Sequence, residues 1–273
     1  MSLESIEQLL LAHHINPNKV LGQNFMVEPA FYPKLCSLAH LSDSDVVLDA
    51  GAGFGLLTRY LVGKCFGVVA VEKDRQLVKV LCREFSSALN VVVVEGDVLT
   101  VSLPLFNKVI AIPPYYLSSD LVLWLLDRRV DYAVLIVQKE FAQRLVAEVG
   151  SDAYGWLTVV VGQLAKAELF DEVPKELFYP QPEVDSIILR IQPWKHKPFE
   201  VKDPAQFIQL VKWLFTQRNK KLAKALTPYL KSHFKLGKKD AEKVTLQWPF
   251  YDKRPRELTP NNFGVIADAL SNY

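Results

Sequence analysis

Between residues 45 and 190 the chain alternates short apolar runs with stretches whose apolar residues recur every three or four positions. The runs predict buried strands, and the recurring pattern predicts amphipathic helices. The expected strands cover 46–50, 67–72, 90–97, 108–112 and 131–138, and the expected helices cover 56–63, 74–87, 119–129 and 139–148. Strands that alternate with helices form a parallel sheet covered on both faces. The pattern therefore predicts an α/β, Rossmann-like, doubly wound core.

The pattern changes after this core. Stretches 158–173 and 184–193 predict two late strands, which we expect to pair antiparallel at one edge of the sheet. A segment rich in proline and lysine, 192–204, is typical of a linker. Beyond it, 204–226, 239–246 and a stretch after residue 260 predict helices. We therefore expect a domain over 1–192, which includes a short N-terminal helical segment, and a small helical domain over 193–273.

The net charge of the 273-residue chain changes sign near the expected domain boundary. Residues 190–273 hold 17 Lys and Arg against 7 Asp and Glu, a net charge of +10, whereas residues 1–189 hold 15 against 23, a net charge of −8. A basic C-terminal part suggests a polyanionic partner. A solvated lysine-rich surface would have the same composition, so charge alone leaves both interpretations open.

Hydropathy, the N-terminal residues, and the cysteines and histidines argue against a membrane protein, a secreted protein and a metalloprotein. Half of the residues are hydrophobic, yet we find no apolar run that approaches the roughly 18–20 residues of a membrane span. The N-terminus lacks the basic region of a secretory signal. The three cysteines form no CxxC pair and the histidines have no ligand spacing, so we expect neither disulfides nor a metal site. These features favour a cytoplasmic protein that does not associate with membranes.

Glycines follow the first expected strand, in the stretch DAGAGFG (49–55). Glycines at a strand-to-helix turn let the backbone approach a ligand closely. Glu72 ends the second strand, where a carboxylate can bind both hydroxyls of a ribose. The pattern fits NAD or S-adenosylmethionine, and a turn without any ligand remains an alternative. Leu56 stands where a dinucleotide GxGxxG fingerprint has its third glycine, which favours S-adenosylmethionine over NAD.

Two further landmarks follow the third and fourth strands. Asp97 can accept a hydrogen bond from an adenine amino group. The fourth strand runs into the loop IPPYY (112–116), where the prolines must end the sheet ladder. A stiff proline turn fixes a backbone carbonyl, and a tyrosine can stack on a base that has left its helix. All these landmarks stand at the carboxyl ends of parallel strands, where such sheets bind ligands.

These motifs resemble those of the ribosomal RNA adenine dimethyltransferase family. The resemblance extends from about Asn18 to about Ala267, and its motifs are LGQNF (21–25), DAGAGFG, VE (71–72), GD (96–97), PY (114–115), FYPQPEVDS (178–186) and FTQRNKK (215–221). It implies a class I S-adenosylmethionine-dependent methyltransferase domain and a small C-terminal helical domain. The implied activity is dimethylation of the N6 amino groups of two adjacent adenosines in small-subunit rRNA during ribosome biogenesis. The compact C-terminal domain resembles that of a prokaryotic, archaeal-type member.

The resemblance also implies roles for individual residues. The target adenine would lie against Ile112, Pro113, Pro114, Tyr115 and Phe178. S-adenosylmethionine, and its product S-adenosylhomocysteine, would be held by Gln23, Asn24, Met26, Gly51, Gly53, Glu72, Lys73, Asp97, Val98 and Ile112. A basic helix over 215–224 would contact the rRNA backbone through Arg218, Lys220, Lys221 and Lys224. No metal is implied, and we expect a monomer that binds the small ribosomal subunit. Without the motif around it, Phe178 would be an ordinary core ring.

One position departs from the family pattern. The family has asparagine at the head of the proline–tyrosine loop, and this chain has Ile112 there, with Pro113 in the next position. Isoleucine removes one of two acceptors for the target amine and leaves the Pro113 carbonyl. The chain is therefore a working methyltransferase, a binding or subunit-assembly factor with little activity, or an enzyme for another amino group. We favour the first, with the second as its main alternative, and an NAD-dependent oxidoreductase as a third class.

Overall fold

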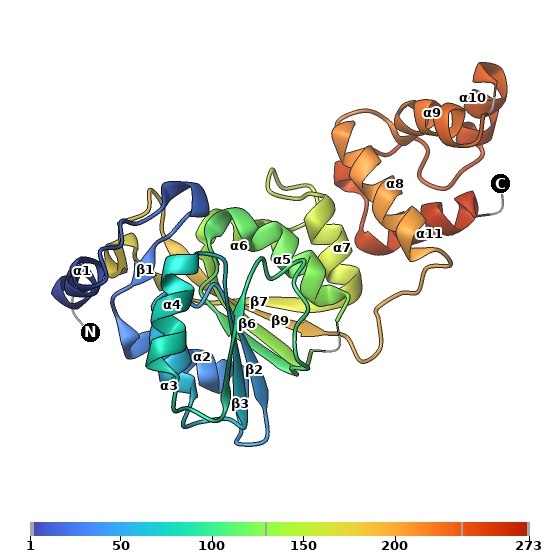
Figure 1. Cartoon of the computed structure of the whole chain (residues 1–273). Helices are drawn as coiled ribbons and strands as arrows, with labels where there is room; N and C mark the ends of the chain where they lie inside the picture. Colours follow the sequence, from blue (N-terminus) through green and yellow to red (C-terminus); the bar gives the residue numbers. More distant parts are fainter. Residues whose placement is uncertain (1–2, 129, 236, 272–273) are drawn as a thin grey trace. The chain divides into compact units, whose positions relative to one another are not determined.

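The computed structural model describes residues 3–128, 130–235 and 237–271. The chain divides into two compact units (Figure 1). The first contains the chain up to Ala142 together with Ala167–Pro193, and the second contains Gln143–Lys166 together with the chain from Trp194 onward. The second unit therefore takes in an internal segment, 143–166, which a single break at residue 193 would leave in the first.

A seven-stranded sheet forms the centre of the first unit, in the order β4-β3-β2-β5-β6-β9-β7. The strands are β2 (Val46–Ala50), β3 (Gly67–Glu72), β4 (Val91–Glu95), β5 (Lys108–Ala111), β6 (Tyr132–Gln138), β7 (Ala165–Val173) and β9 (Ser186–Pro193). Strands β2 to β6 are parallel, and β9 pairs antiparallel with β6. Residues 133–137 of β6 are fully buried, as a central strand covered on both faces requires. The predicted doubly wound core is confirmed, and so is the antiparallel pairing of the second late strand, β9.

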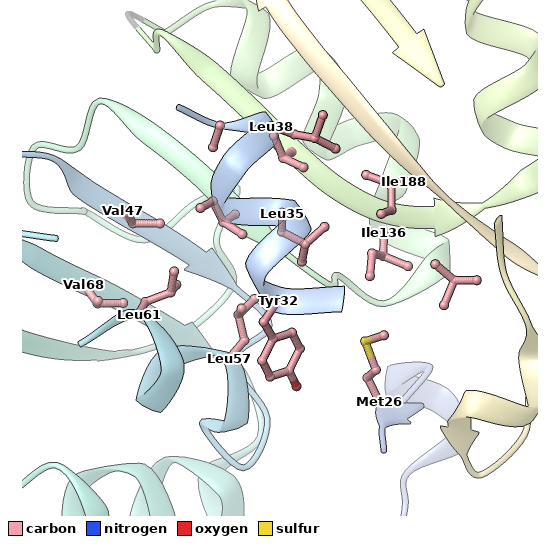
Figure 2. Close-up of a cluster of buried hydrophobic side chains, with 14 of the residues drawn as sticks. Met26, Tyr32, Leu35, Leu38, Val47, Leu57, Leu61, Val68, Ile136 and Ile188 are labelled. Atoms are coloured by element: carbon pink, nitrogen blue, oxygen red, sulfur yellow. The ribbon is translucent and has the colours of Figure 1, made fainter. Parts of the chain in front are cut away.

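Helices of the first unit lie around this sheet, except for α1, which contacts strand β8 (Phe178–Tyr179) and lies apart from the sheet (Figure 1). They are α1 (Leu3–Ala12), α2 (Tyr32–Leu38), α3 (Leu56–Leu61), α4 (Arg75–Glu84), α5 (Ser118–Leu126) and α6 (Lys139–Leu145). Helix α2 packs on β6, while α3 contacts β2 and β3. Figure 2 shows the apolar cluster that results, in which Leu35 of α2 and Leu61 of α3 join Val47 and Ile136 of the sheet. Apolar burial of this kind stabilises the fold by about 25 cal/mol per Å².

A second, two-stranded sheet joins two distant segments. Strand β1 (Phe25–Met26) pairs antiparallel with β8 (Phe178–Tyr179), which places Met26 opposite Phe178. The sequence pattern does not predict this pair, because two residues carry no detectable alternation. The pairing brings the LGQNF and FYPQPEVDS motifs together.

The second unit is helical, and one of its helices was predicted as a strand. Its helices are α7 (Trp156–Leu164), α8 (Pro204–Thr216), α9 (Leu222–His233), α10 (Lys238–Leu246) and α11 (Pro260–Leu270). The expected strand over 158–173 is wrong in its first half, since only β7 is extended. The β-branched run 159–161 favours a strand locally. All three valines are fully buried, and α7 packs on both α8 and α11, so tertiary packing decides in favour of a helix.

The single helix predicted over 204–226 is also wrong. Helix α8 ends at Thr216, a turn follows, and α9 begins at Leu222. The first backbone N–H groups of α9 donate elsewhere, Leu222 to the Lys253 carbonyl at 2.7 Å and Ala223 to the Tyr251 carbonyl at 3.0 Å. A nearby loop therefore provides the acceptors that a continuous helix would have provided, and the apolar spacing cannot reveal this.

Candidate active site

One cavity lies at the carboxyl ends of β2, β3, β4 and β5. It contains every residue that the resemblance assigns to the cofactor or to the target adenine. The N-terminal segment over 21–26 forms a further wall of the same cavity. Their convergence follows from the parallel sheet, because the carboxyl ends of its strands meet at one edge.

The glycine loop between β2 and α3 is held in a conformation that favours glycine. Gly51 has a φ of 83° and Gly53 a φ of 59°. A Cβ on Gly51 would lie 2.9 Å from Pro114 Cδ, and one on Gly53 would lie 3.2 Å from the Phe25 ring. Gly51 and Gly53 are therefore required for two reasons: their φ angles are positive, and neighbouring side chains leave little room for a Cβ atom. Gly51 and Gly53 therefore line the cavity with backbone atoms alone.

Glu72 braces this loop from the end of β3. One carboxylate oxygen accepts the Gly53 N–H at 2.9 Å, and the other accepts the N–H groups of Lys73 and Asp74, each at 2.8 Å. Burial raises the pKa of Glu72, and these three N–H groups offset only part of that rise. A carboxylate has about four lone-pair positions, so one remains for a ligand hydroxyl.

Asp97 lies next along the edge. Its carboxylate accepts the Leu99 N–H at 3.0 Å and pairs with the Lys73 ammonium at 3.1 Å. Burial alone would raise the pKa of Asp97, but the Leu99 N–H and the Lys73 charge lower it below its ordinary value. Asp97 is thus an ionised acceptor at neutral pH, and Lys73 already neutralises its charge.

Asp49, the last acidic residue of β2, is more deeply buried. Its carboxylate accepts the Thr58 hydroxyl at 2.6 Å, and the side chain is 1 % exposed. Burial raises the pKa of Asp49 to about 7, with the nearby Glu72 charge adding to the rise. In the sequence, Asp49 stands out only as the first residue of the DAGAGFG motif.

The N-terminal wall is tied down by side chains. Gln23 donates to Asp74 at 2.9 Å and accepts the Asn18 N–H at 2.8 Å, while Asn24 donates to the Gly22 carbonyl at 3.2 Å. Gln23 and Asn24 therefore hold the segment in place through their side chains. Their predicted role in cofactor binding would be exerted through this wall as well as by direct contact.

The proline–tyrosine loop forms the opposite end of the cavity. Strand β5 ends at Ala111, so Ile112 lies just beyond the ladder, where it packs against the apolar cluster of Figure 2. The Tyr115 hydroxyl lies 2.6 Å from Ser186 Oγ, and Ser186 is fully buried. The tyrosine ring is therefore held at both its backbone and its hydroxyl. The serine of the FYPQPEVDS motif is the anchor.

Neither Asn107 nor Ser118 lines the cavity, so neither takes the place of the family asparagine. Asn107 lies at the start of β5, away from the cavity, where its amide bonds Asp45, Val46 and Asp131. Ser118 is buried outside the cavity lining, and its hydroxyl has no partner among the described residues. The Pro113 carbonyl accepts no hydrogen bond from the described residues, whereas the Pro114 carbonyl accepts the Leu117 N–H at 3.0 Å.

Phe178 does not present a ring face in this structure. It lines the cavity, but it is only 2 % exposed and belongs to the apolar cluster with Met26. Stacking on a target base would require it to become more exposed, so its predicted contact with the adenine stays a prediction.

The residues predicted to bind RNA lie in the second unit, on the turn between α8 and α9 and on the first turn of α9. They are not on one basic helix over 215–224, as the sequence pattern suggested. Arg218 donates to the backbone carbonyls of Ser151 and Asp152 at 3.1 and 3.0 Å. Arg218 therefore holds the internal segment 143–166 in place, while Lys220, Lys221 and Lys224 are exposed.

The described residues contain no group of three or more His, Cys, Asp or Glu side chains arranged to hold a metal ion. Among the described helices, none combines the length and the apolar character needed to cross a bilayer.

Comparison with known proteins places the chain. A family model for the ribosomal RNA adenine dimethylase matches residues 14–259. The chain belongs to this family. A curated relative from Methanosarcina mazei, named "Probable ribosomal RNA small subunit methyltransferase A", is 37% identical over 91% of each chain. One of the same name from Methanopyrus kandleri is 36% identical over 99% of this chain and 98% of its own.

Solved structures agree with the family assignment. A dimethyladenosine transferase from Plasmodium falciparum has a TM-score of 0.78 at 27% identity, covering 90% of this chain and 96% of its own. The 23S rRNA methyltransferase ErmE has a TM-score of 0.63 at 26% identity, covering 88% and 97%. The fold of this dimethylase family member is therefore that of a methyltransferase, and an NAD-dependent oxidoreductase is excluded as its class.

Proposed function

We propose that this protein transfers methyl groups from S-adenosylmethionine to the N6 amino groups of two adjacent adenosines in small-subunit rRNA. The observation that carries the proposal is the single cavity in which the glycine loop, Glu72, Asp97 and the Pro113–Tyr115 turn meet. The names of the two curated relatives support the substrate class. We further propose that it acts as a monomer on small ribosomal subunits in the cytoplasm.

The residues present fit S-adenosylmethionine. The free lone-pair position of Glu72 suits a ribose hydroxyl, and the ionised Asp97 suits an adenine amino group. The bare loop at Gly51 and Gly53 leaves room for the methionine part. When bound, this cofactor supplies an electrophilic methyl group on a sulfonium.

The chain's own task is to orient the target amine. An exocyclic adenine amine is a poor nucleophile, because its lone pair is delocalised into the ring. Acceptors that take its hydrogens turn the lone pair toward the methyl group, and correct orientation provides much of the rate. We assign this acceptor role to the unengaged Pro113 carbonyl. Tyr115, anchored on Ser186, stacks on the base and offsets about 1–3 kcal/mol of the cost of unstacking it.

Ile112 is the reason for the alternative function, a family member with little catalytic activity that acts in subunit assembly. Its side chain packs against apolar residues and offers no acceptor. Losing one positioned polar group of this kind typically costs about 100- to 1000-fold in rate. A family member that keeps the cofactor site but methylates slowly would act mainly as a binding factor in subunit assembly. We favour the active enzyme, because the cofactor residues and the Pro114–Tyr115 pair are intact.

The test uses isotope-labelled S-adenosylmethionine, under-methylated small ribosomal subunits, and the Ile112→Asn variant alongside the parent. Labelled mono- and dimethyladenosine are separated after digestion of the rRNA. Dimethyladenosine at comparable rates from both proteins supports the Pro113 carbonyl as a sufficient acceptor. Label from the variant alone would reject the enzymatic proposal in favour of the assembly factor.

A further inference from the structure

The Tyr32 side chain is largely buried, but its hydroxyl lies at a cavity wall. Tyr32 begins α2, and its side chain is 4 % exposed. Figure 2 shows its ring at the border of the apolar cluster, with the oxygen pointing away from Leu35 and Leu38. No described residue hydrogen-bonds to this oxygen. Ser118 Oγ is the one fully enclosed and unpaired side-chain atom among the described residues, so the unpaired Tyr32 oxygen still reaches open cavity space.

The hydroxyl belongs to the wall of the proposed cofactor cavity. A second, mostly apolar cavity lies beside it, lined by residues that include Arg59 and Tyr60. Met26, Tyr32 and Leu56 line both cavities, so these three side chains separate them. Of the three, only tyrosine can donate a hydrogen bond. Its partner must therefore come from the contents of a cavity.

Sheet order shows which part of the cofactor lies near this wall. Along the edge, Asp97 follows β4, Glu72 ends β3, and the glycine loop follows β2. Tyr32 lies close to that loop, because its ring is 5.5 Å from that of Tyr60 on α3, the helix that follows the loop. With the adenine at Asp97 and the ribose at Glu72, the amino-acid end of the cofactor extends over the loop toward Tyr32.

The charges around Tyr32 suit that end of the molecule. Burial, together with the negative charges of Asp49 and Glu28, raises the pKa of Tyr32, so its hydroxyl stays protonated and remains a donor. Asp49 lines the same cavity, where its carboxyl group can face an ammonium. A hydroxyl donor beside a carboxyl acceptor is complementary to an α-carboxylate beside an α-ammonium.

We propose that Tyr32 is a specificity-determining residue whose hydroxyl donates to the α-carboxylate of S-adenosylmethionine. The inference rests on the proposed function and deepens it, because it names the part of the cofactor that this chain recognises at the glycine-loop end of the cavity. Tyr32 takes no part in methyl transfer and acts through cofactor affinity alone.

The experiment is calorimetric titration of the full chain and its Tyr32→Phe variant with two compounds, S-adenosylmethionine and decarboxylated S-adenosylmethionine. The variant keeps the ring and loses only the hydroxyl. We expect its Kd for S-adenosylmethionine to rise about 5- to 20-fold, and its Kd for the decarboxylated compound to change less than about twofold. Tyr60→Phe is the matched control, since Tyr60 lines the second cavity but not the proposed cofactor cavity, and it should change neither value.

Each contrary result has its own meaning. An unchanged Kd for both compounds, or an equal rise for both, would overturn the carboxylate assignment while leaving the proposed function intact. Failure of the unaltered protein to bind either compound would instead overturn the proposed function. Thermal melting of Tyr32→Phe should match the parent, because the hydroxyl has no hydrogen-bond partner among the described residues. A lowered midpoint would show that the hydroxyl has a structural partner, and would also overturn the assignment.

Discussion

The cavity of the first unit and the basic turn of the second unit use charge in opposite ways. In the cavity, Glu72 and Asp97 are engaged by backbone N–H groups or by an ion pair before any ligand arrives. On the turn, Lys220, Lys221 and Lys224 are exposed and pair with none of the described acidic residues. The first arrangement fixes geometry, as a reaction requires. The exposed lysines of the turn provide a positive electrostatic field, which can attract phosphates in many arrangements.

Removing Glu72 should have the largest effect of all. In Glu72→Ala the N–H groups of Gly53, Lys73 and Asp74 lose their shared acceptor. We expect S-adenosylmethionine affinity to fall by at least about 100-fold and the free energy of unfolding to fall by roughly 2–4 kcal/mol. Calorimetric titration and urea unfolding measure the two. Unchanged stability would contradict the bracing role.

Releasing Tyr115 should affect the reaction and spare cofactor binding. Ser186→Ala and Tyr115→Phe each remove the 2.6 Å hydrogen bond and leave the ring in place. We expect each to lower kcat about 10-fold with an unchanged Kd for S-adenosylmethionine. Single-turnover methylation of small subunits gives the rate. Because both variants remove one bond, the double variant should be no slower than either, and additive losses would show that they act separately.

Arg218 and Lys220 allow the same comparison within the basic turn, because the arginine is bonded to the protein and the lysine is exposed. Arg218→Ala removes two bonds to backbone carbonyls of the internal segment, so we expect the free energy of unfolding to fall by about 1–3 kcal/mol. Lys220→Ala should leave stability unchanged and reduce the salt dependence of RNA affinity by about one counterion. Urea unfolding and binding titrations across salt concentrations measure these effects. If Arg218→Ala instead reduced the salt dependence and Lys220→Ala lowered the free energy of unfolding, the arginine would be the residue that contacts RNA.

The smallest effect should come from Lys73. This cavity residue resembles the lysines of the basic turn, because its charge is exposed to solvent. Its ammonium pairs with Asp97, but its side chain is half exposed. We expect Lys73→Met to change S-adenosylmethionine affinity by no more than about threefold, because the Lys73–Asp97 ion pair is exposed to solvent and therefore weak. A change above 10-fold in the same titration would mean that the lysine contacts the cofactor directly.

The same division explains what the sequence could predict. Short apolar runs that end in Gly51, Glu72 and Asp97 predict the strands, their order of alternation and the edge where the cavity lies. Such runs are local, so the chain itself carries the signal. The β1–β8 pair, the Tyr115–Ser186 bond and the buried position of Phe178 join segments far apart in the chain. Local pattern contains no information about them.

Two errors have the same origin. The valines over 159–161 favour a strand locally, and only their burial between α8 and α11 makes them helical. The interruption after Thr216 depends on carbonyls of residues 251 and 253. Tyr32 illustrates the limit for function, because nothing in its neighbourhood distinguishes it from an ordinary core aromatic until its hydroxyl is found at a cavity wall.

The chain passes between the two units three times, near residues 142, 166 and 193, and this has a practical consequence for dissection of the protein. The helical unit is not a removable tail. A fragment that stops at residue 193 would still contain α7, whose valines would lose the cover of α8 and α11, and would present that apolar stripe to water. A fragment that starts at residue 194 would lack one of its own core helices. Domain exchange between family members must therefore transfer two separate stretches of gene together.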